Sequence, residues 1–236
     1  VYDISYRISY QCYNFCIILN NTFLPDFYLK INNLNEKSRY EIPNFLFQYF
    51  ILYILFCSCL SYFSFEIVTL FLAKEFYFTI NISSILCMFF SFYFFQTIPI
   101  LVHLGESFTI SKLTAIFFII SLSIVLPGTY YFGIYGLALG LTISNIINSI
   151  IYISVCQKKL NLYWNFKIIF KIYFYFMISS TILIFLREVE FFYILRLFIK
   201  LCFLSFLIYY ANSIGNFNVK LYFDLATKKI FQLLNR

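Results

Sequence analysis

The stretch 113–157, LTAIFFIISLSIVLPGTYYFGIYGLALGLTISNIINSIIYISVCQ, runs for forty-five residues without one charged side chain. About 20 apolar residues cross the ~30 Å hydrocarbon layer of a bilayer, so this stretch is long enough for two membrane helices. The segment 127–133, PGTYYFG, divides it near the middle. Because proline lacks a backbone donor and glycine accepts a positive φ, we expect a tight turn within this segment.

Four small or amide residues follow that turn, each four residues after the last: Gly136, Gly140, Ser144 and Asn148. This spacing places them on one face of a helix. Small residues let a second membrane helix approach closely, and Ser and Asn can form hydrogen bonds across the contact. We therefore expect a close helix–helix contact on this face.

Composition predicts the same class of protein for the whole chain. Hydrophobic residues make up 62% of it and charged residues 11%, whereas about 25% of a soluble domain is charged. The fold class expected is all-α: a polytopic integral membrane bundle of about seven transmembrane helices within residues 1–216. The expected spans are 6–24, 45–65, 78–102, 113–125, 134–155, 168–186 and 191–211. Residues 217–236 are predicted to form a cytoplasmic amphipathic helix on the membrane surface.

The first expected span carries a polar stripe. Its members are Asp3, Arg7, Gln11, Asn14 and Asn21, whose spacing places them along one side of a helix. Exposure of such a stripe to acyl chains is costly, which predicts that it faces protein or a water-filled cavity. The alternative is an i,i+4 ion pair between Asp3 and Arg7 that reaches the membrane interface.

The basic residues predict the orientation. If the seven spans alternate in direction, twelve of the seventeen Lys and Arg lie in loops on one side and only Lys74 and Arg187 on the other. Lysine and arginine accumulate in cytoplasmic loops, so the C-terminus is expected in the cytoplasm and the first span enters from outside. The net charge of +7 then reflects topology and attraction to membrane lipids, and no nucleic-acid partner is expected.

Two strings resemble the bacterial polysaccharide (O-antigen) flippases, which belong to the multidrug, oligosaccharidyl-lipid and polysaccharide exporter superfamily. The matches near the centre of the chain are Gly133, Gly136, Ala138, Ile143 and Ser144. The matches in the opening YDISYRI are Tyr2, Asp3, Ile4, Arg7 and Ile8. Pro127 departs from the pattern. The family proline usually lies close before the first glycine of the pattern, whereas Pro127 lies six residues before Gly133, the matching glycine here. The resemblance covers about residues 2–160, and the last two spans match nothing specific.

The resemblance implies a function and a place in a larger transporter. Members of the family translocate undecaprenyl-pyrophosphate-linked oligosaccharides, the repeat units of O-antigen or capsule, across the bacterial inner membrane by alternating access. Together with the orientation, it implies the C-terminal half of a transporter of twelve to fourteen helices. In this interpretation Arg7 binds the pyrophosphate, while Gln11 and Asn14 bind sugar hydroxyls. The expected partners are the lipid-linked oligosaccharide, membrane lipids, and the polymerase and chain-length machinery of polysaccharide biosynthesis.

The sequence offers no catalytic constellation, so we expect no enzyme. Its one histidine, His103, lies at a helix end, and no Ser/His/Asp set or Gly-rich phosphate loop is present. The seven cysteines lie mostly in apolar runs without histidine or acidic neighbours, so no metal site or cofactor is expected. Two alternatives remain open. One is an oligosaccharide polymerase or other membrane enzyme of the same pathway, and the other is a multidrug exporter of the same superfamily.

Overall fold

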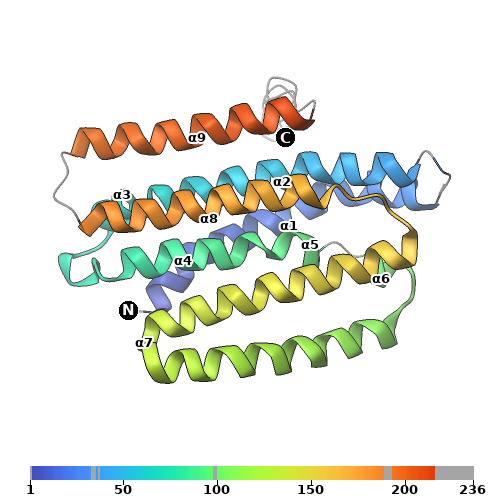
Figure 1. Cartoon of the computed structure of the whole chain (residues 1–236), viewed down its shortest axis with the longest axis horizontal. Coiled ribbons are helices and arrows are strands. Elements are labelled where there is room, and N and C mark those ends of the chain that lie inside the picture. The colour runs from blue at the N-terminus through green and yellow to red at the C-terminus, as the bar shows by residue number, and fades with distance from the viewer. Residues whose placement is uncertain (1, 33–35, 37, 98–99, 189–192, 216–236) are drawn as a thin grey trace, which may run out of the picture.

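The computed structural model describes residues 2–32, 36, 38–97, 100–188 and 193–215, and every regular element in these ranges is a helix (Figure 1). The helices are α1 (Tyr2–Asn32), α2 (Ser38–Tyr62), α3 (Ser64–Phe71), η1 (Lys74–Phe76), α4 (Thr79–Ser91), α5 (Tyr93–Thr97), α6 (Ile100–His103), α7 (Ser107–Leu160), α8 (Phe166–Glu188) and α9 (Tyr193–Gly215). The helical stretches long and apolar enough to cross a membrane are Ser38–Tyr62, Thr79–His103, Ser107–Leu160, Phe166–Arg187 and Tyr193–Ser213. The chain is therefore an all-α, multi-pass membrane bundle, as predicted. The predicted tail, 217–236, lies outside the described residues.

The first helix, α1, is long enough to span but more polar than the others, and it does not end where the sequence predicts. It continues beyond the expected span 6–24, through Pro25 to Asn32. The reason is an apolar stripe that does not stop at the proline: Phe23, Phe27 and Ile31 are all buried at i,i+4 spacing.

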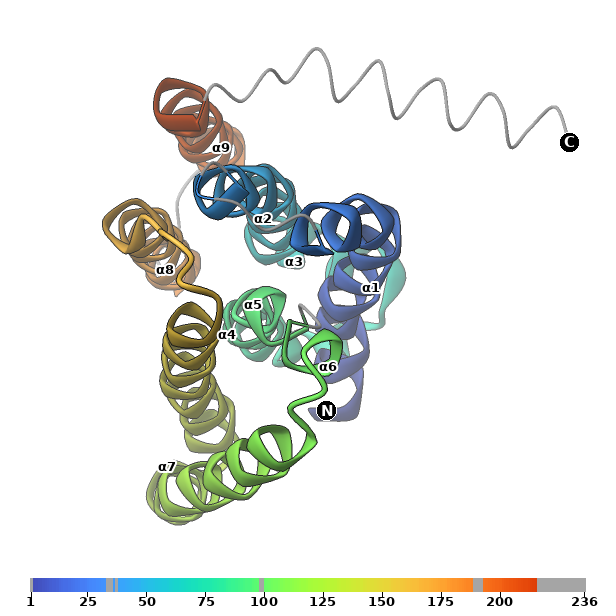
Figure 2. The ribbon, with the colours of Figure 1, turned by 90° about the vertical axis from the view of Figure 1, so that its right-hand side faces the viewer.

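The centre of the bundle is α4. Every residue from Ile82 to Ser91 is buried, and an end-on view shows α1, α2, α8 and α7 arranged around α4 and α5 (Figure 2). The expected span 78–102 is thus one membrane crossing built from α4, α5 and α6. The last helix, α9, lies at the periphery beside α2 and α8 (Figure 2).

The long α7 is a hairpin of two arms joined at Gly133, whose φ is 58° and ψ is −135° (Figure 1). The chain reversal predicted within 127–133 is confirmed, and it lies at Gly133 rather than at Pro127 or Gly128. Both residues lie inside the first arm, and membrane helices tolerate an internal proline. The reversal needs a positive φ, and among the residues of α7 only Gly133 adopts one.

Glycines hold the two arms close together. A Cβ atom built on Gly136 would lie 1.8 Å from the carbonyl oxygen of Gly128, and one built on Gly128 would lie 2.9 Å from the carbonyl oxygen of Gly136. A Cβ on Gly140 would lie 3.1 Å from the Cα of Val125. The predicted close contact is confirmed, and the helix that makes it is the first arm of the same hairpin.

The predicted hydrogen-bonding role of Ser144 is wrong, because its hydroxyl donates to Leu141 within the same arm. The cross-helix bonds come from the neighbouring face instead. Asn145 donates to the carbonyl of Phe89 at 2.7 Å and accepts from Gln96 at 2.6 Å. Gln96 also donates to Ser149 at 2.8 Å. The buried Asn145 and the half-buried Gln96 fix the second arm of α7 against α4 and α5.

The connections gather at two opposite ends of the bundle. At one end His103 bonds Asn32 at 3.0 Å, and Lys159 Nζ lies 2.5 Å from Glu106 Oε1. The hydrogen bond from Lys159 lowers the pKa of Glu106, and a second from Thr109 adds to the effect. The α7 turn, η1 and the end of α8 lie at the other end (Figure 1). This arrangement is what spans of alternating direction require.

Candidate functional site

The polar face of α1 carries the three residues that the sequence predicts for substrate binding. Arg7 Nε lies 2.9 Å from Asp3 Oδ2, and these side chains are 77% and 72% exposed. Gln11 donates to the backbone carbonyl of Arg7 at 3.3 Å, and Asn14 donates to Gln11 Oε1 at 3.2 Å. The structure therefore brings Arg7, Gln11 and Asn14 together in one continuous polar row. The row includes the Asp3–Arg7 ion pair that was the alternative interpretation.

Hydroxyl groups on the opposite face of α1 hold the polar row outward. Ser5 donates to the carbonyl of Thr79 at 3.2 Å, and Ser9 donates to the carbonyl of Ser83 at 2.9 Å. Both serines are fully buried. Because these bonds fix α1 against α4, the side of the helix that bears Arg7 points away from the bundle core.

A pocket of about 460 Å³ borders the polar row. Arg7 and Gln11 lie on its wall, and the remaining lining side chains are apolar. They are Ile4 and Ile8 of α1, Leu60 of α2, Ile67 and Phe71 of α3, and Leu72. Asn14 does not line this pocket. A guanidinium group beside an apolar wall suits a ligand with a hydrocarbon part and an anionic part.

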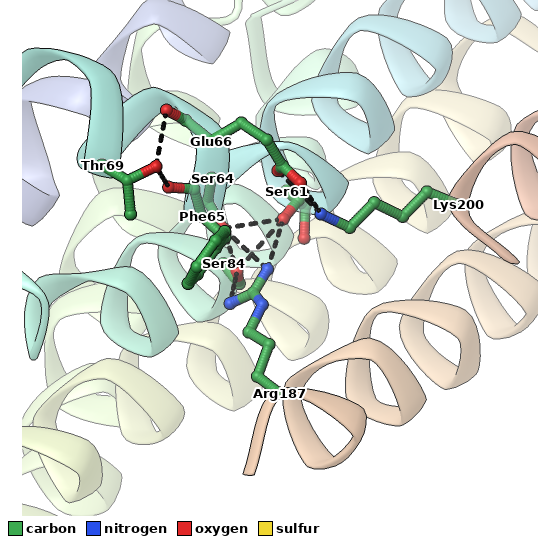
Figure 3. A network of polar contacts seen from close by, with 8 residues as sticks. All are labelled: Ser61, Ser64, Phe65, Glu66, Thr69, Ser84, Arg187 and Lys200. Carbon is green, nitrogen blue, oxygen red and sulfur yellow. Dashed lines mark hydrogen bonds and ion pairs between the residues drawn. The ribbon is translucent and has the colours of Figure 1, made fainter. Parts of the chain in front are cut away.

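A second polar cluster lies where α2, α3, α4, α8 and α9 meet, and Arg187 is at its centre (Figure 3). One terminal nitrogen of Arg187 donates to Asn81 at 3.2 Å and to Ser84 at 3.0 Å. The other donates to the carbonyl of Ser61 at 3.1 Å and to Ser64 at 2.8 Å. Four bonds to α2, α3 and α4 thus anchor the end of α8.

The same cluster contains a buried ion pair between α3 and α9. Lys200 Nζ lies 2.5 Å and 2.7 Å from the two carboxylate oxygens of Glu66. The Lys200 side chain is 3% exposed and that of Glu66 is 15% exposed. Arg196 lies over the ring of Phe65, 5.3 Å from its centroid. Buried charges in membrane helices are costly and need such partners.

Sequence reasoning did not identify this cluster. The sequence places Arg196 and Lys200 inside the expected last span, 191–211, and Arg187 in the loop before it. Glu66 and Lys200 are 134 residues apart, so spacing cannot pair them. The available signal is that each is a charged residue within an otherwise apolar helix, and such residues in membrane segments need partners.

Among the residues the structure describes, no group of three His, Cys, Asp or Glu side chains is placed to hold a metal ion. The seven cysteines are all free thiols, and five of them are buried. His103 stacks on Tyr28 with ring centroids 4.8 Å apart and bonds Asn32, which is a packing arrangement at a helix end.

Comparisons of the chain with protein-family models, with curated proteins and with solved structures found no match. The resemblance to the polysaccharide flippases therefore stays a prediction.

Proposed function

We propose that the chain is part of a flippase that moves an undecaprenyl-pyrophosphate-linked oligosaccharide across the bacterial inner membrane. One observation carries the proposal: Arg7 and Gln11 lie on the wall of an otherwise apolar pocket between α1, α2 and α3. The apolar wall suits a polyprenyl chain, and the planar guanidinium of Arg7 suits a pyrophosphate, which it can bind in bidentate fashion.

The exposed polar row supports the same proposal. A row with Arg7 77% exposed is costly against acyl chains, and it is stable against a water-filled cavity. In alternating access, such a cavity lies between two helix bundles that move relative to one another. The proposal accordingly makes this bundle the C-terminal half of the transporter, with its C-terminus in the cytoplasm and the second half across the polar face of α1.

The test is transport by the full gene product in proteoliposomes. The substrate is undecaprenyl pyrophosphate bearing a fluorescent saccharide, and chemical quenching from outside measures how much of it changes leaflet. We expect faster movement than in empty liposomes, and Arg7→Ala should abolish the difference. Arg7→Lys should retain part of it, because the charge survives while the bidentate fork does not.

The Asp3→Ala variant separates a substrate role from a structural ion pair. If Arg7 binds substrate, combining Arg7→Ala with Asp3→Ala leaves transport absent at a normal protein level. Recovery of transport in the double variant would assign Arg7 to the ion pair. Wild-type movement no faster than in empty liposomes would refute the flippase, and movement of a lipophilic cation instead would favour the multidrug exporter.

A further inference from the structure

Four tyrosines form a continuous row along α1. The ring centroids of Tyr2 and Tyr6 are 6.2 Å apart, those of Tyr6 and Tyr10 are 5.7 Å apart, and those of Tyr10 and Tyr13 are 5.2 Å apart. All four side chains are half-buried. We call this set the tyrosine row.

Two aromatic side chains of α4 and α5 support the tyrosine row from behind. The ring of Phe90 lies 5.5 Å from Tyr6, 5.9 Å from Tyr10 and 6.5 Å from Tyr13. Tyr93 meets Tyr13 edge-on at 5.6 Å. The rings are thus held by packing, which gives a rigid surface with little rotamer entropy left to lose on binding.

The tyrosine row runs beside the polar row, residue by residue. Each tyrosine immediately precedes a polar residue in the sequence, giving the pairs Tyr2-Asp3, Tyr6-Arg7, Tyr10-Gln11 and Tyr13-Asn14. Successive residues of an α-helix are rotated by about 100°, so the two rows are parallel and adjacent. Ile4 and Ile8, which line the apolar pocket, lie on the other side of the polar row.

The phenolic hydroxyls are available for a ligand. No hydrogen bond within the described part of the chain involves the hydroxyl groups of the tyrosine row or of the neighbouring Tyr93. None of these hydroxyl oxygens is fully buried, so a ligand can reach them. Hydrocarbon would leave them unsatisfied, which costs free energy at each position.

A membrane interface does not account for the whole row. From the first tyrosine to the last, the helix rises about 16 Å at 1.5 Å per residue. The polar layer on each side of the hydrocarbon core is only about 5–8 Å thick. Interfacial anchoring therefore explains one or two of these tyrosines, and the others need a polar environment at the depth of the membrane.

We propose that the tyrosine row is a saccharide-binding surface, with Gln11 and Asn14 as its amide partners. A sugar ring has an apolar C–H face and a rim of hydroxyls, and tyrosine offers a ring face together with a hydroxyl that donates and accepts. Around α1 the order is apolar pocket, then Arg7, then tyrosines. This order matches a lipid tail, a pyrophosphate and a sugar. The inference rests on the proposed flippase function and assigns the sugar part of its substrate.

The test compares affinities of the full gene product in nanodiscs for undecaprenyl pyrophosphate and for the same lipid bearing glucose, galactose or N-acetylglucosamine. We expect the wild type to bind at least one glycosylated lipid more tightly than the bare lipid. Combining Tyr6→Leu with Tyr10→Leu should reduce that preference about two- to tenfold while leaving affinity for the bare lipid unchanged. The preference is the ratio of the affinities for the glycosylated lipid and the bare lipid, so it does not depend on the fraction of folded protein. Tyr209→Leu, an exposed tyrosine on the distant α9, is the matched control and should change nothing.

The outcomes separate the two proposals. Failure of the wild type to bind either the bare lipid or any of the glycosylated lipids would refute the flippase function. Binding of the bare lipid without a glycosylated preference, or a preference that survives in the Tyr6/Tyr10 variant, would overturn the saccharide surface alone. If the variant keeps the preference but loses association with a second helix bundle in crosslinking, the tyrosine row is a protein contact and the proposal is wrong.

Discussion

The ion pair between Glu66 and Lys200 predicts an asymmetric response to mutation. Removing one partner of a buried pair leaves the other charge unpaired and costs about 3–5 kcal/mol of the free energy of unfolding. Lys200 is the more deeply buried partner, at 3% exposure, and Arg187 and Arg196 add positive charge within its electrostatic reach. We therefore expect Glu66→Gln to be near the upper end of that range and Lys200→Met near the lower end.

The double variant isolates the interaction itself. Because Glu66→Gln combined with Lys200→Met leaves neither charge, its cost should fall below the sum of the single costs by about 2–3 kcal/mol. Purified protein in mild detergent would be unfolded with increasing dodecyl sulfate, and the fluorescence of Trp164 would report the transition. Trp164 is the one tryptophan of the chain, and it is buried against Phe95.

The control is Lys171→Met, which removes an exposed lysine of α8 and should change the unfolding free energy by less than about 0.5 kcal/mol. Single variants that also remain within about 0.5 kcal/mol of the wild type would refute the buried pair. Additive costs in the double variant would show that the two residues do not interact.

Three further predictions concern other parts of the bundle. Gly136→Leu should sharply lower the amount of folded protein in membranes, since even a Cβ there would overlap the Gly128 carbonyl. The control is Leu139→Ala, on the exposed side of the same arm, and normal yields for Gly136→Leu would contradict the close contact. In a cysteine-free background, a cysteine at Lys74 should react with a membrane-impermeant reagent in intact cells and one at Lys159 should not; the reverse pattern would invert the orientation. Because the pKa of Glu106 is lowered, its contribution to stability is present above the ordinary glutamate pKa of about 4.3 and is lost as the pH falls through the lowered value. Melting temperatures measured between pH 7 and pH 3 should therefore fall more for the wild type than for Glu106→Gln, and parallel curves would show that the Lys159 contact is absent in solution.

Local features of the fold could be predicted from the sequence because the information lies within one or two turns of helix. The uncharged stretch 113–157 predicted two helices joined by a turn, and Gly136 and Gly140 predicted a close helix contact, although not which helix makes it. The exact turn within 127–133 could not be located, since Pro127, Gly128 and Gly133 all permit a break and only the packed arms select Gly133. The expected span 6–24 stops short of the end of α1 for a related reason: Pro25 is a strong local signal, but burial of Phe27 and Ile31 outweighs it.

The candidate site likewise has features that could be predicted from one helix and features that depend on packing between helices. Arg7, Gln11 and Asn14 share one face of one helix, so their alignment follows from helical periodicity. The pocket beside them also involves α2 and α3, and the Arg187 cluster joins five helices. Residue spacing within one helix therefore could not predict either feature. The tyrosine row is visible as four Tyr-polar pairs in the sequence, but only the ring of Phe90 on α4 shows that it is a held surface.

The glycine contact within α7 has a consequence for how the protein is made. The two arms meet through Gly128 and Gly136, only eight positions apart, so the contact can form as soon as this segment leaves the ribosome. Such short-range contacts close quickly because little chain entropy is lost. The hairpin can therefore enter the bilayer as a paired unit before α8 and α9 insert, and its second arm can then pack through Asn145 and Ser149 against α4 and α5, which precede it in the chain.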